Sequence, residues 1–134
     1  MSGRIFDTSV LLDVITADVR WVGWSEGQLR AATAIGPVLI NPIVYAELAP
    51  AFRARVDLDA WLDVAVFRRL PLPYAAGWRA AQAFLVYRRA GGARTSPLPD
   101  FYIGAHAEVE GLTVVTRDAA RYRTYFPSVP IIAP

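Results

Sequence analysis

Short runs of β-favouring residues alternate with helix-compatible stretches along the whole chain. Such alternation is typical of a sheet of parallel strands, because each parallel connection needs a crossover long enough to hold a helix. The expected strands are residues 4–6, 38–40, 66–70, 112–115 and 129–132. The expected helices are residues 9–15, 25–34, 42–50, 58–64, 74–90, 99–110 and 119–125. The sequence therefore predicts an α/β fold with a central, mostly parallel sheet.

Nothing in the chain divides it into parts, since it has no internal repeat, linker or low-complexity segment. We expect a single domain over residues 1–134, because that length can bury a sizeable core. A hydrophobic content of 54% against 19% charged residues excludes a disordered chain. Polar residues and prolines interrupt every apolar run, and the first residues lack the pattern of a signal peptide. We expect a cytoplasmic protein that makes no membrane contact.

Several residue types needed by common enzymes are missing. The chain has no cysteine, which excludes thiol nucleophiles, thiolate zinc sites and disulfides. All 14 basic residues are arginines, so a P-loop lysine and a Schiff-base lysine are excluded. The only histidine, His106, makes a catalytic triad improbable and lies between alanines, where a core or interface role is favoured. Carboxylates, hydroxyls, arginines and metal ions remain as catalytic groups.

Two predicted strands end at an aspartate. Asp7 follows the run Ile5-Phe6, and Asp118 follows Val114-Val115-Thr116-Arg117. The carboxyl ends of parallel strands form the rim where ligands bind, so two carboxylates there suggest a site for a hard cation. Each aspartate is also explained by helix capping, and this alternative stays open.

Two further carboxylates lie on predicted helices. Asp100 follows Pro99 at a helix start, where an acid commonly stabilises free amides. Glu47 has only apolar neighbours at helical spacing: Ile43, Val44, Pro50 and Ala51. Burying such a carboxylate is costly without a partner. Either this helix end is exposed or the partner lies outside the chain, and a metal ion fits the second case.

The other charged residues show weaker patterns. Asp57, Asp59 and Asp63 indicate a solvated helix face, and Asp13 fits no pattern. Arginines recur in close pairs, with aromatic residues nearby in sequence: Arg53 and Arg55, Arg68 and Arg69, Arg88 and Arg89, Arg121 and Arg123, with Tyr74, Trp78, Tyr87, Tyr122 and Tyr125. Two explanations of these pairs stay open. Either the arginines contact phosphates and the aromatic rings stack on bases, or the pairs belong to an ordinary solvated surface.

In chain order, the acids lie in four short motifs: Phe6-Asp7-Thr8-Ser9, Tyr45-Ala46-Glu47-Leu48, Pro99-Asp100-Phe101-Tyr102-Ile103-Gly104-Ala105-His106-Ala107 and Val115-Thr116-Arg117-Asp118. This pattern resembles the PIN domain family and, within it, the VapC-type toxins of bacterial toxin–antitoxin pairs. The likeness covers nearly the whole chain. It departs from the usual family pattern at Phe101 and Tyr102, where smaller or aliphatic residues are commoner.

The resemblance implies a PIN-like α/β/α sandwich and an endoribonuclease that depends on Mg²⁺ or Mn²⁺. It implies an RNA substrate, a homodimer and a small antitoxin partner whose tail occupies the site. Asp7, Glu47, Asp100 and Asp118 match the family's metal-binding acids, and Thr116 matches the threonine beside the last acid. The family often has asparagine at the last position, so Asp118 is expected to be the least essential acid.

Other functions agree less well with the residues. A haloacid-dehalogenase-like phosphatase expects an aspartate at position 9 and a lysine, and a phospho-receiver domain also needs the lysine. A Ras-like GTPase needs a glycine-rich phosphate loop that the chain lacks. A PIN-like nuclease acting on DNA or in RNA processing, and a PIN-like module that only binds RNA or protein, remain as alternatives.

Overall fold

A five-stranded parallel sheet forms the centre of the protein in the computed structural model, which describes residues 3–134. The strands are β1 (Arg4–Phe6), β2 (Val38–Ile40), β3 (Phe67–Arg69), β4 (Thr113–Val115) and β5 (Ile131–Ile132). They lie in the order β3-β2-β1-β4-β5, and all neighbouring pairs are parallel. The expected parallel sheet is confirmed.

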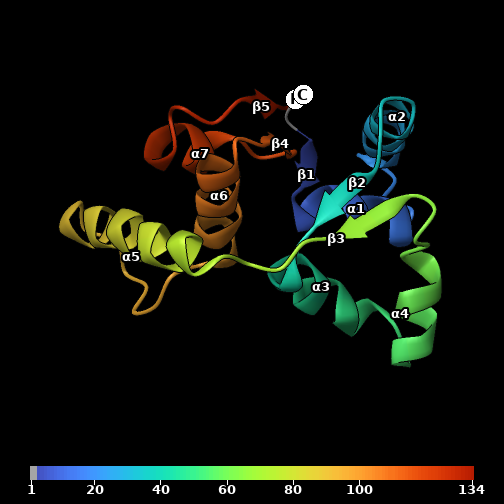
Figure 1. The fold of residues 1–134 in the computed structure, drawn as a ribbon, viewed down its shortest axis with the longest axis horizontal. Coiled ribbons are helices and arrows are strands. Elements are labelled where there is room, and N and C mark those ends of the chain that lie inside the picture. Colours follow the sequence, from blue (N-terminus) through green and yellow to red (C-terminus); the bar gives the residue numbers. More distant parts are fainter. Residues whose placement is uncertain (1–2) are drawn as a thin grey trace.

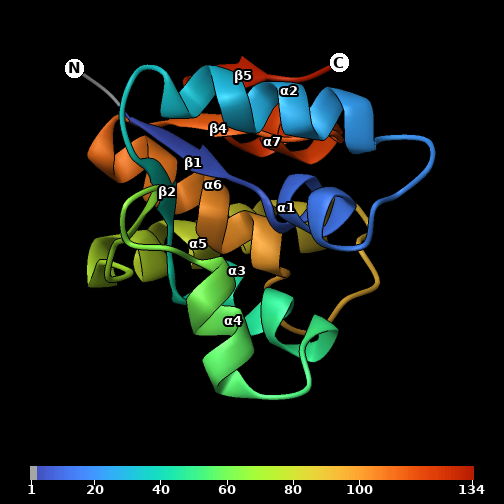
Figure 2. The ribbon, with the colours of Figure 1, turned by 90° about the vertical axis from the view of Figure 1, so that its right-hand side faces the viewer.

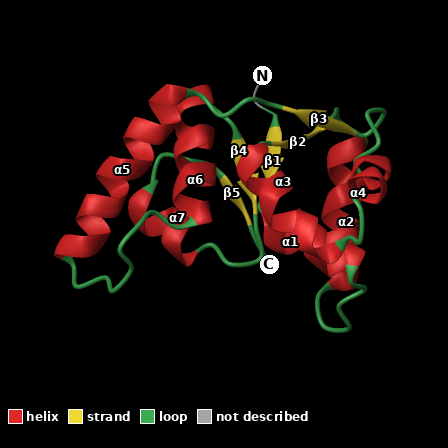
Figure 3. Cartoon of the chain, turned by 90° about the horizontal axis from the view of Figure 1, so that it is seen from below, coloured by secondary structure: helices red, strands yellow, loops and turns green. Residues whose placement is uncertain are grey.

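Helices cover both faces of this sheet (Figure 1). They are α1 (Thr8–Ile15), α2 (Val22–Thr33), α3 (Pro42–Leu48), the short 3₁₀ helix η1 (Ala49–Ala51), α4 (Arg55–Trp61), α5 (Tyr74–Arg89), α6 (Pro99–Glu110) and α7 (Ala120–Tyr125). Figure 3 shows α5, α6 and α7 on one side of the sheet, and α1, α2 and α4 on the other. Figure 2 looks onto this second side. The α/β/α sandwich expected from the resemblance is confirmed.

The strand order places a crevice beside β1. From β1 the chain moves through β2 to β3 toward one edge, whereas β4 and β5 extend toward the other edge. Right-handed crossovers in opposite directions put their helices on opposite faces, so the connections diverge between β1 and β4. Ligands bind in such sheets outside the carboxyl ends of the two strands at this divergence. Asp7 and Thr116 directly follow these two strands.

Burial explains why the strands read as unbroken apolar runs. Ile5 and Phe6 of β1 and all three residues of β2 are buried, as expected for strands covered on both faces. Each such large side chain contributes about 1.5–3 kcal/mol when removed from water. The edge strand β3 instead exposes Arg68 and Arg69, and charges there discourage pairing with another chain.

Several predicted boundaries are wrong by a few residues. The helix expected at 25–34 begins at Val22, because the Asp18 carboxylate accepts the backbone N–H groups of Arg20 and Trp21. The helix expected at 58–64 runs instead from Arg55 to Trp61. A turn held by Asp63, which accepts the Ala65 amide, ends that region and leads into β3. The outer strands β3 and β5 are shorter than expected.

Within residues 3–134, every helix is too short or too polar to cross a lipid bilayer.

Candidate functional site

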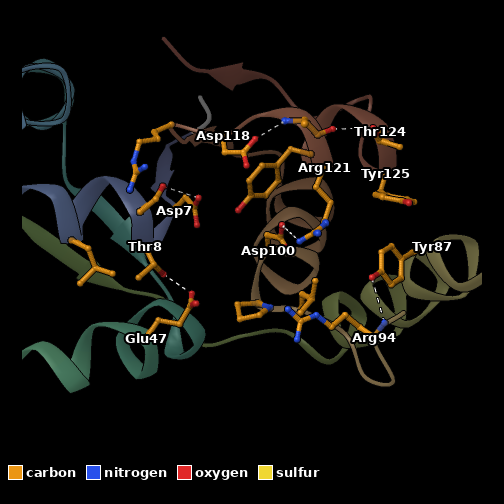
Figure 4. A pocket seen from close by; sticks show the side chains of 17 residues that line it. Asp7, Thr8, Glu47, Tyr87, Arg94, Asp100, Asp118, Arg121, Thr124 and Tyr125 are labelled. Atoms are coloured by element: carbon orange, nitrogen blue, oxygen red, sulfur yellow. Dashed lines mark hydrogen bonds and ion pairs between the residues drawn. The ribbon is translucent and has the colours of Figure 1, made fainter. Parts of the chain in front are cut away.

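A pocket of about 830 Å³ opens at the carboxyl ends of β1 and β4. All four acids singled out from the sequence line it: Asp7, Glu47, Asp100 and Asp118. They come from the ends of two strands and from helices α3 and α6 (Figure 4). Folding therefore brings carboxylates from four separate parts of the chain to one cavity.

Asp7 lies at the junction of β1 and α1. Its amide donates to the carbonyl of Val115 at 2.9 Å, which continues the pairing of β1 with β4. Its side chain makes no capping hydrogen bond to α1. Instead, Oδ2 accepts the hydroxyls of Thr116 at 2.8 Å and Ser9 at 3.0 Å. Asp7 therefore occupies the N-cap position of α1, as the capping explanation expects, but its side chain makes no capping bond and lines the pocket instead.

The environment of Asp7 disfavours its negative charge. Burial raises the pKa of Asp7 above its ordinary value, and the nearby carboxylate of Asp100 raises it further. The hydroxyls of Thr116 and Ser9 act in the opposite direction and stabilise the charged form. The carboxylate is held in place by neutral donors, without a cation of its own among the described residues.

Glu47 reaches the pocket from the end of α3. Asn41 begins this helix, because its Oδ1 accepts the amides of Ile43 and Val44 and Pro42 follows at the first helical position. The half-buried Glu47 carboxylate accepts the Thr8 hydroxyl at 2.6 Å. The sequence allowed either exposure or an external partner; the structure shows partial exposure and a partner on α1.

A neutral hydroxyl does not cancel the charge of Glu47. Burial raises the pKa of Glu47, and the negative charges of Asp7 and Asp100 add to this effect, while the Thr8 hydroxyl opposes it. Glu47 therefore senses two of the other acids electrostatically, although they lie far away in sequence.

Asp100 lies in the first turn of α6, after Pro99. Its Oδ2 accepts Nη1 of Arg121 on α7 at 2.9 Å. Its Oδ1 is buried and has no hydrogen-bond partner within residues 3–134. A buried oxygen without a partner is costly, so one coordination position of this carboxylate is open to a further ligand.

The loop after β4 supplies Thr116 and Asp118. Thr116 is buried; its hydroxyl donates to Asp7 and accepts the Asp118 amide at 3.1 Å. Asp118 is the most exposed of the four acids, and its Oδ1 accepts the Ala120 amide at 3.3 Å. The capping explanation therefore applies in part to Asp118.

Asp13 was missed as a residue that supports the site. It is buried on α1 and accepts the Ser25 hydroxyl at 2.8 Å and Nε of Arg117 at 3.1 Å. Arg117 also lies over the ring of Trp21. This ion pair connects α1 to the loop that carries Thr116 and Asp118. A sequence signal existed, because Asp13 follows the buried Val10 by three residues, on the inward face of an apolar helix.

A second wall of the pocket is basic and aromatic. Arg94, Arg121, Tyr87 and Tyr125 lie on this wall (Figure 4). Arg117 and Tyr122 also line the pocket. The sequence paired Arg121 with Arg123, but only Arg121 lines the pocket, while Arg123 is exposed outside it. Tyr74 and Trp78 are exposed on α5 and do not line the pocket. Tertiary structure thus separates residues that the sequence grouped.

Tyr122 lines the same pocket as the acids. It is buried, and its hydroxyl has no hydrogen-bond partner among the described residues. Burial raises the pKa of Tyr122 well above its ordinary value, and the charges of Asp7 and Asp100 add to this. Tyr122 therefore stays protonated beside the acid cluster and can act only as a neutral hydroxyl.

His106 connects the helices that carry Glu47 and Asp100. It is fully buried in α6, and its Nδ1 accepts Nδ2 of Asn41, the residue that begins α3, at 3.1 Å. Burial lowers the pKa of His106, although Glu110, 3.6 Å from its Nε2, acts in the opposite direction. The neutral form with a proton on Nε2 lets Nδ1 accept from Asn41, as expected for a core histidine, while Nε2 itself has no hydrogen-bond partner among the described residues.

The carboxylates do not form a ready-made metal cluster. Across the part of the chain that the structure describes, no three His, Cys, Asp or Glu side chains approach closely enough to hold an ion as they stand. Asp7, Glu47 and Asp100 are each turned toward a hydroxyl or a guanidinium. Oxygen-only donors do suit Mg²⁺ or Mn²⁺, and Asp100 Oδ1 is unpartnered. The chemistry of these donors therefore fits such an ion.

Comparisons with known proteins agree with this fold. A model of the PIN domain family matches residues 4–127. Curated protein sequences give no significant match. The structure is similar to a chain of VapBC2 from Rickettsia felis bound to a promoter DNA fragment, at 15% identity and a TM-score of 0.73, covering 98% of each chain.

Two further complexes contain similar chains. VapBC from Salmonella typhimurium, bound to DNA, matches at 21% identity and a TM-score of 0.70, over 99% of this chain and 98% of the other. A toxin–antitoxin complex from Klebsiella pneumoniae matches at 20% identity and a TM-score of 0.65, over 97% and 96%. At these identities the likeness establishes a shared fold.

Proposed function

Because this chain belongs to the PIN domain family, we propose that it is a metal-dependent endoribonuclease and the toxin of a toxin–antitoxin pair. The observation that carries this proposal is the meeting of Asp7, Glu47, Asp100 and Asp118 in one pocket. The pocket lies at the divergence of the strand connections, where α/β sheets bind ligands.

In this proposal Asp7, Glu47 and Asp100 hold one or two Mg²⁺ or Mn²⁺ ions, and Asp118 joins directly or through water. Such an ion lowers the pKa of bound water and stabilises charge on a phosphate under attack. Thr116 orients Asp7, and Thr8 orients Glu47, through the hydrogen bonds described above. Outer hydrogen bonds of this kind hold metal ligands in place.

The electrostatics of the pocket support a cation partner. Asp7 and Glu47 both have a raised pKa, in part because each senses the charge of Asp100. Gathering carboxylates in this way costs free energy that a divalent ion recovers. A module that only binds RNA would gain nothing from this negative charge, which argues against the non-catalytic alternative.

The second wall of the pocket supports a nucleic-acid substrate. Arg94 offers charge for phosphates, while Tyr87 and Tyr125 offer rings on which unpaired bases stack. The cavity volume of about 830 Å³ lies within the range typical of ligand sites. The choice of RNA over DNA follows from the resemblance to VapC-type toxins.

Two protein partners belong to the proposal. The similar solved structures are toxin–antitoxin complexes, which supports an antitoxin for this chain. A homodimer is supported by the outer face of α5, where Tyr74, Trp78 and Leu85 recur at helical spacing and are 99%, 72% and 52% exposed. An apolar stripe of this kind is typical of a surface that another protein covers.

The decisive experiment compares RNA and DNA cleavage by the parent protein and by Asp7→Asn. With Mg²⁺ present, the parent is expected to cut a single-stranded RNA, and the variant to be slower by more than about 100-fold. Circular dichroism checks that the variant is folded. Equal cleavage by the two proteins would refute the assignment, and preferential cleavage of matched DNA would favour the DNA-nuclease alternative.

A further inference from the structure

Arg121 occupies the acid pocket itself. From α7 its Nη1 donates to Oδ2 of Asp100 at 2.9 Å, so a cationic side chain lies against one of the four carboxylates (Figure 4). The guanidinium also lies 5.9 Å from the ring centre of Tyr87 and 5.7 Å from that of Phe101. These contacts hold Arg121 in a defined position at the N-terminal end of α6.

The ion pair occupies one of the two carboxylate oxygens of Asp100. Asp100 uses Oδ2 for Arg121 and leaves only its buried Oδ1 without a partner. A divalent ion bound to Asp100 would lie close to the guanidinium, and the two positive charges would repel each other. Arg121 and a metal ion therefore compete for the negative charge of this carboxylate.

The pair is also weak enough to be broken. Its side chains are 39% and 23% exposed, and ion pairs that contact solvent contribute little net stability. An ion that gains oxygen ligands from several carboxylates can displace such a partner, whereas a fully buried pair would resist displacement. The exposure of Arg121 also leaves room for its long side chain to swing toward solvent.

We propose that Arg121 is a tethered counter-cation that neutralises Asp100 in the metal-free protein and is displaced when a divalent ion enters. This inference rests on the proposed function, because it takes Asp100 to be a metal ligand. Arg121 therefore weakens metal binding and sets the concentration of ion at which the site fills. It is a positioning residue for Asp100.

Arg123 provides a matched control. It lies two residues further along the same helix, is exposed, and forms no ion pair with any residue in the described range 3–134. Replacing either arginine removes one positive charge from α7, but only Arg121→Gln frees Asp100. General electrostatic effects therefore act on both variants, while the proposed competition acts on one.

The first test measures Mn²⁺ affinity by isothermal titration calorimetry for the parent, Arg121→Gln, Arg123→Gln and Asp100→Asn. We expect Arg121→Gln to bind Mn²⁺ about three- to tenfold more tightly than the parent. Arg123→Gln should remain close to the parent, and Asp100→Asn should bind more weakly. A merely structural role for Arg121 would weaken metal binding, not strengthen it.

The outcomes separate the two proposals. If Asp100→Asn weakens Mn²⁺ binding while Arg121→Gln leaves it unchanged or weaker, the counter-cation inference is wrong and the metal site stands. If Arg121→Gln and Arg123→Gln tighten binding equally, only net charge matters and the inference is again wrong. If neither the parent nor any variant binds Mn²⁺, the proposed metal-dependent function fails together with it.

A second measurement avoids any folding defect of Arg121→Gln. Arginine Nη–H signals of the ¹⁵N-labelled parent are followed by NMR at low temperature during titration with diamagnetic Mg²⁺, because Nη1 of Arg121 makes the bond to Asp100. Arg121→Lys identifies the signal of Arg121. We expect this signal to shift, and its protons to exchange faster with water, as Mg²⁺ binds Asp100 and breaks the bond between Asp100 and Arg121. An Arg121 signal that stays unchanged while the Asp100 amide responds to Mg²⁺ would overturn the inference.

Discussion

The hydroxyl of Thr116 donates a 2.8 Å hydrogen bond to Oδ2 of Asp7, although 109 positions separate the two residues in sequence. The bond joins the carboxyl end of β1 to that of β4, the two strands between which the connections diverge. Thr116 is fully buried, so water cannot replace this donor if it is lost. The orientation of Asp7 therefore depends on the far end of the chain.

Thr116→Val should test this dependence, because it keeps the shape of the side chain and removes the hydroxyl. We expect a loss of about 1–3 kcal/mol in the free energy of unfolding, since Asp7 and the Asp118 amide both lose a partner. RNA cleavage should fall by about 10- to 100-fold. Thr116→Ser retains the donor and should stay near the parent in urea unfolding and in cleavage. Equal behaviour of the two variants would show that the hydroxyl is unimportant.

Asp13→Asn should destabilise the protein although Asp13 does not line the pocket. The variant weakens the ion pair with Arg117 and leaves that guanidinium, 34% exposed, without its buried partner. We expect a loss of about 2 kcal/mol by urea unfolding, less than for a fully buried pair. Glu26→Gln, which breaks the exposed pair with Arg30, is the control and should cost less than about 0.5 kcal/mol. Similar losses for both would contradict a specific role of Asp13.

The acid pocket should make stability fall as pH rises when no divalent ion is present. The pKa values of Asp7 and Glu47 are raised in the folded state above 3.8 and 4.5, mainly by burial. Between the ordinary and the raised pKa the folded state binds more protons than the unfolded state, so unfolding becomes easier with increasing pH. Asp7→Asn should therefore be more stable than the parent at neutral pH, with the gain shrinking on acidification.

Thermal unfolding across pH in a chelator measures this effect. Added Mg²⁺ should then raise the melting temperature of the parent more than that of Asp7→Asn, since only the intact site binds the ion well. A parent protein whose advantage over Asp7→Asn grew with pH in the chelator would contradict the raised pKa of Asp7.

His106 should make the protein less stable as pH falls below neutrality, which is opposite to the effect of Asp7 and Glu47. Burial lowers the pKa of His106 in the folded state below its ordinary value of 6.5. As pH falls through 6.5, the unfolded state therefore binds a proton before the folded state does, and the free energy of unfolding decreases. Protonation of Nδ1 would also break the bond from Asn41 that links α6 to α3. His106→Gln should be less stable at pH 7 but should lose this part of the acid sensitivity. Urea unfolding at several pH values, with Glu110→Gln as a control for the nearby carboxylate, tests the effect.

Trp78→Asp should dissociate the proposed homodimer. Trp78 is 72% exposed on the outer face of α5, far from the core, so the variant is expected to fold normally. Val56→Asp on α4, at a position that is 71% exposed, introduces the same charge elsewhere and serves as the matched control. Sedimentation velocity should give a monomer for the first variant and a dimer for the second. Dimers in both would place the interface on another surface.

Local sequence patterns predicted most of the fold, because each pattern acts over a few residues. The apolar run Val38–Ile40 became a buried strand, and Asn41 with Pro42 began the following helix at the expected position. Predicted boundaries were wrong where an aspartate side chain bonded backbone amides two or three residues further along the chain. Asp18 extended α2 toward its start by bonding two amides, and the turn at Asp63 ended the region that follows α4.

The acids of the pocket were identifiable for a similar reason. A carboxylate at the end of a parallel strand has a known location, because parallel strands share one rim. The same reasoning could not assign partners. Thr8 as the donor to Glu47, Arg117 as the partner of Asp13 and Arg121 as the partner of Asp100 follow from packing between elements.

Residue types and short-range order alone limited this protein to a parallel α/β sheet, an oxygen-rich site and no thiol or lysine chemistry. Those properties do not depend on how the helices pack, because they follow from composition and from backbone preferences within one turn or strand. Which hydroxyl or guanidinium each acid binds, and how strongly burial raises its pKa, depends on distances of a few ångströms between segments up to 109 residues apart. Electrostatic and hydrogen-bond energies vary steeply over such distances, and packing of the whole chain sets them.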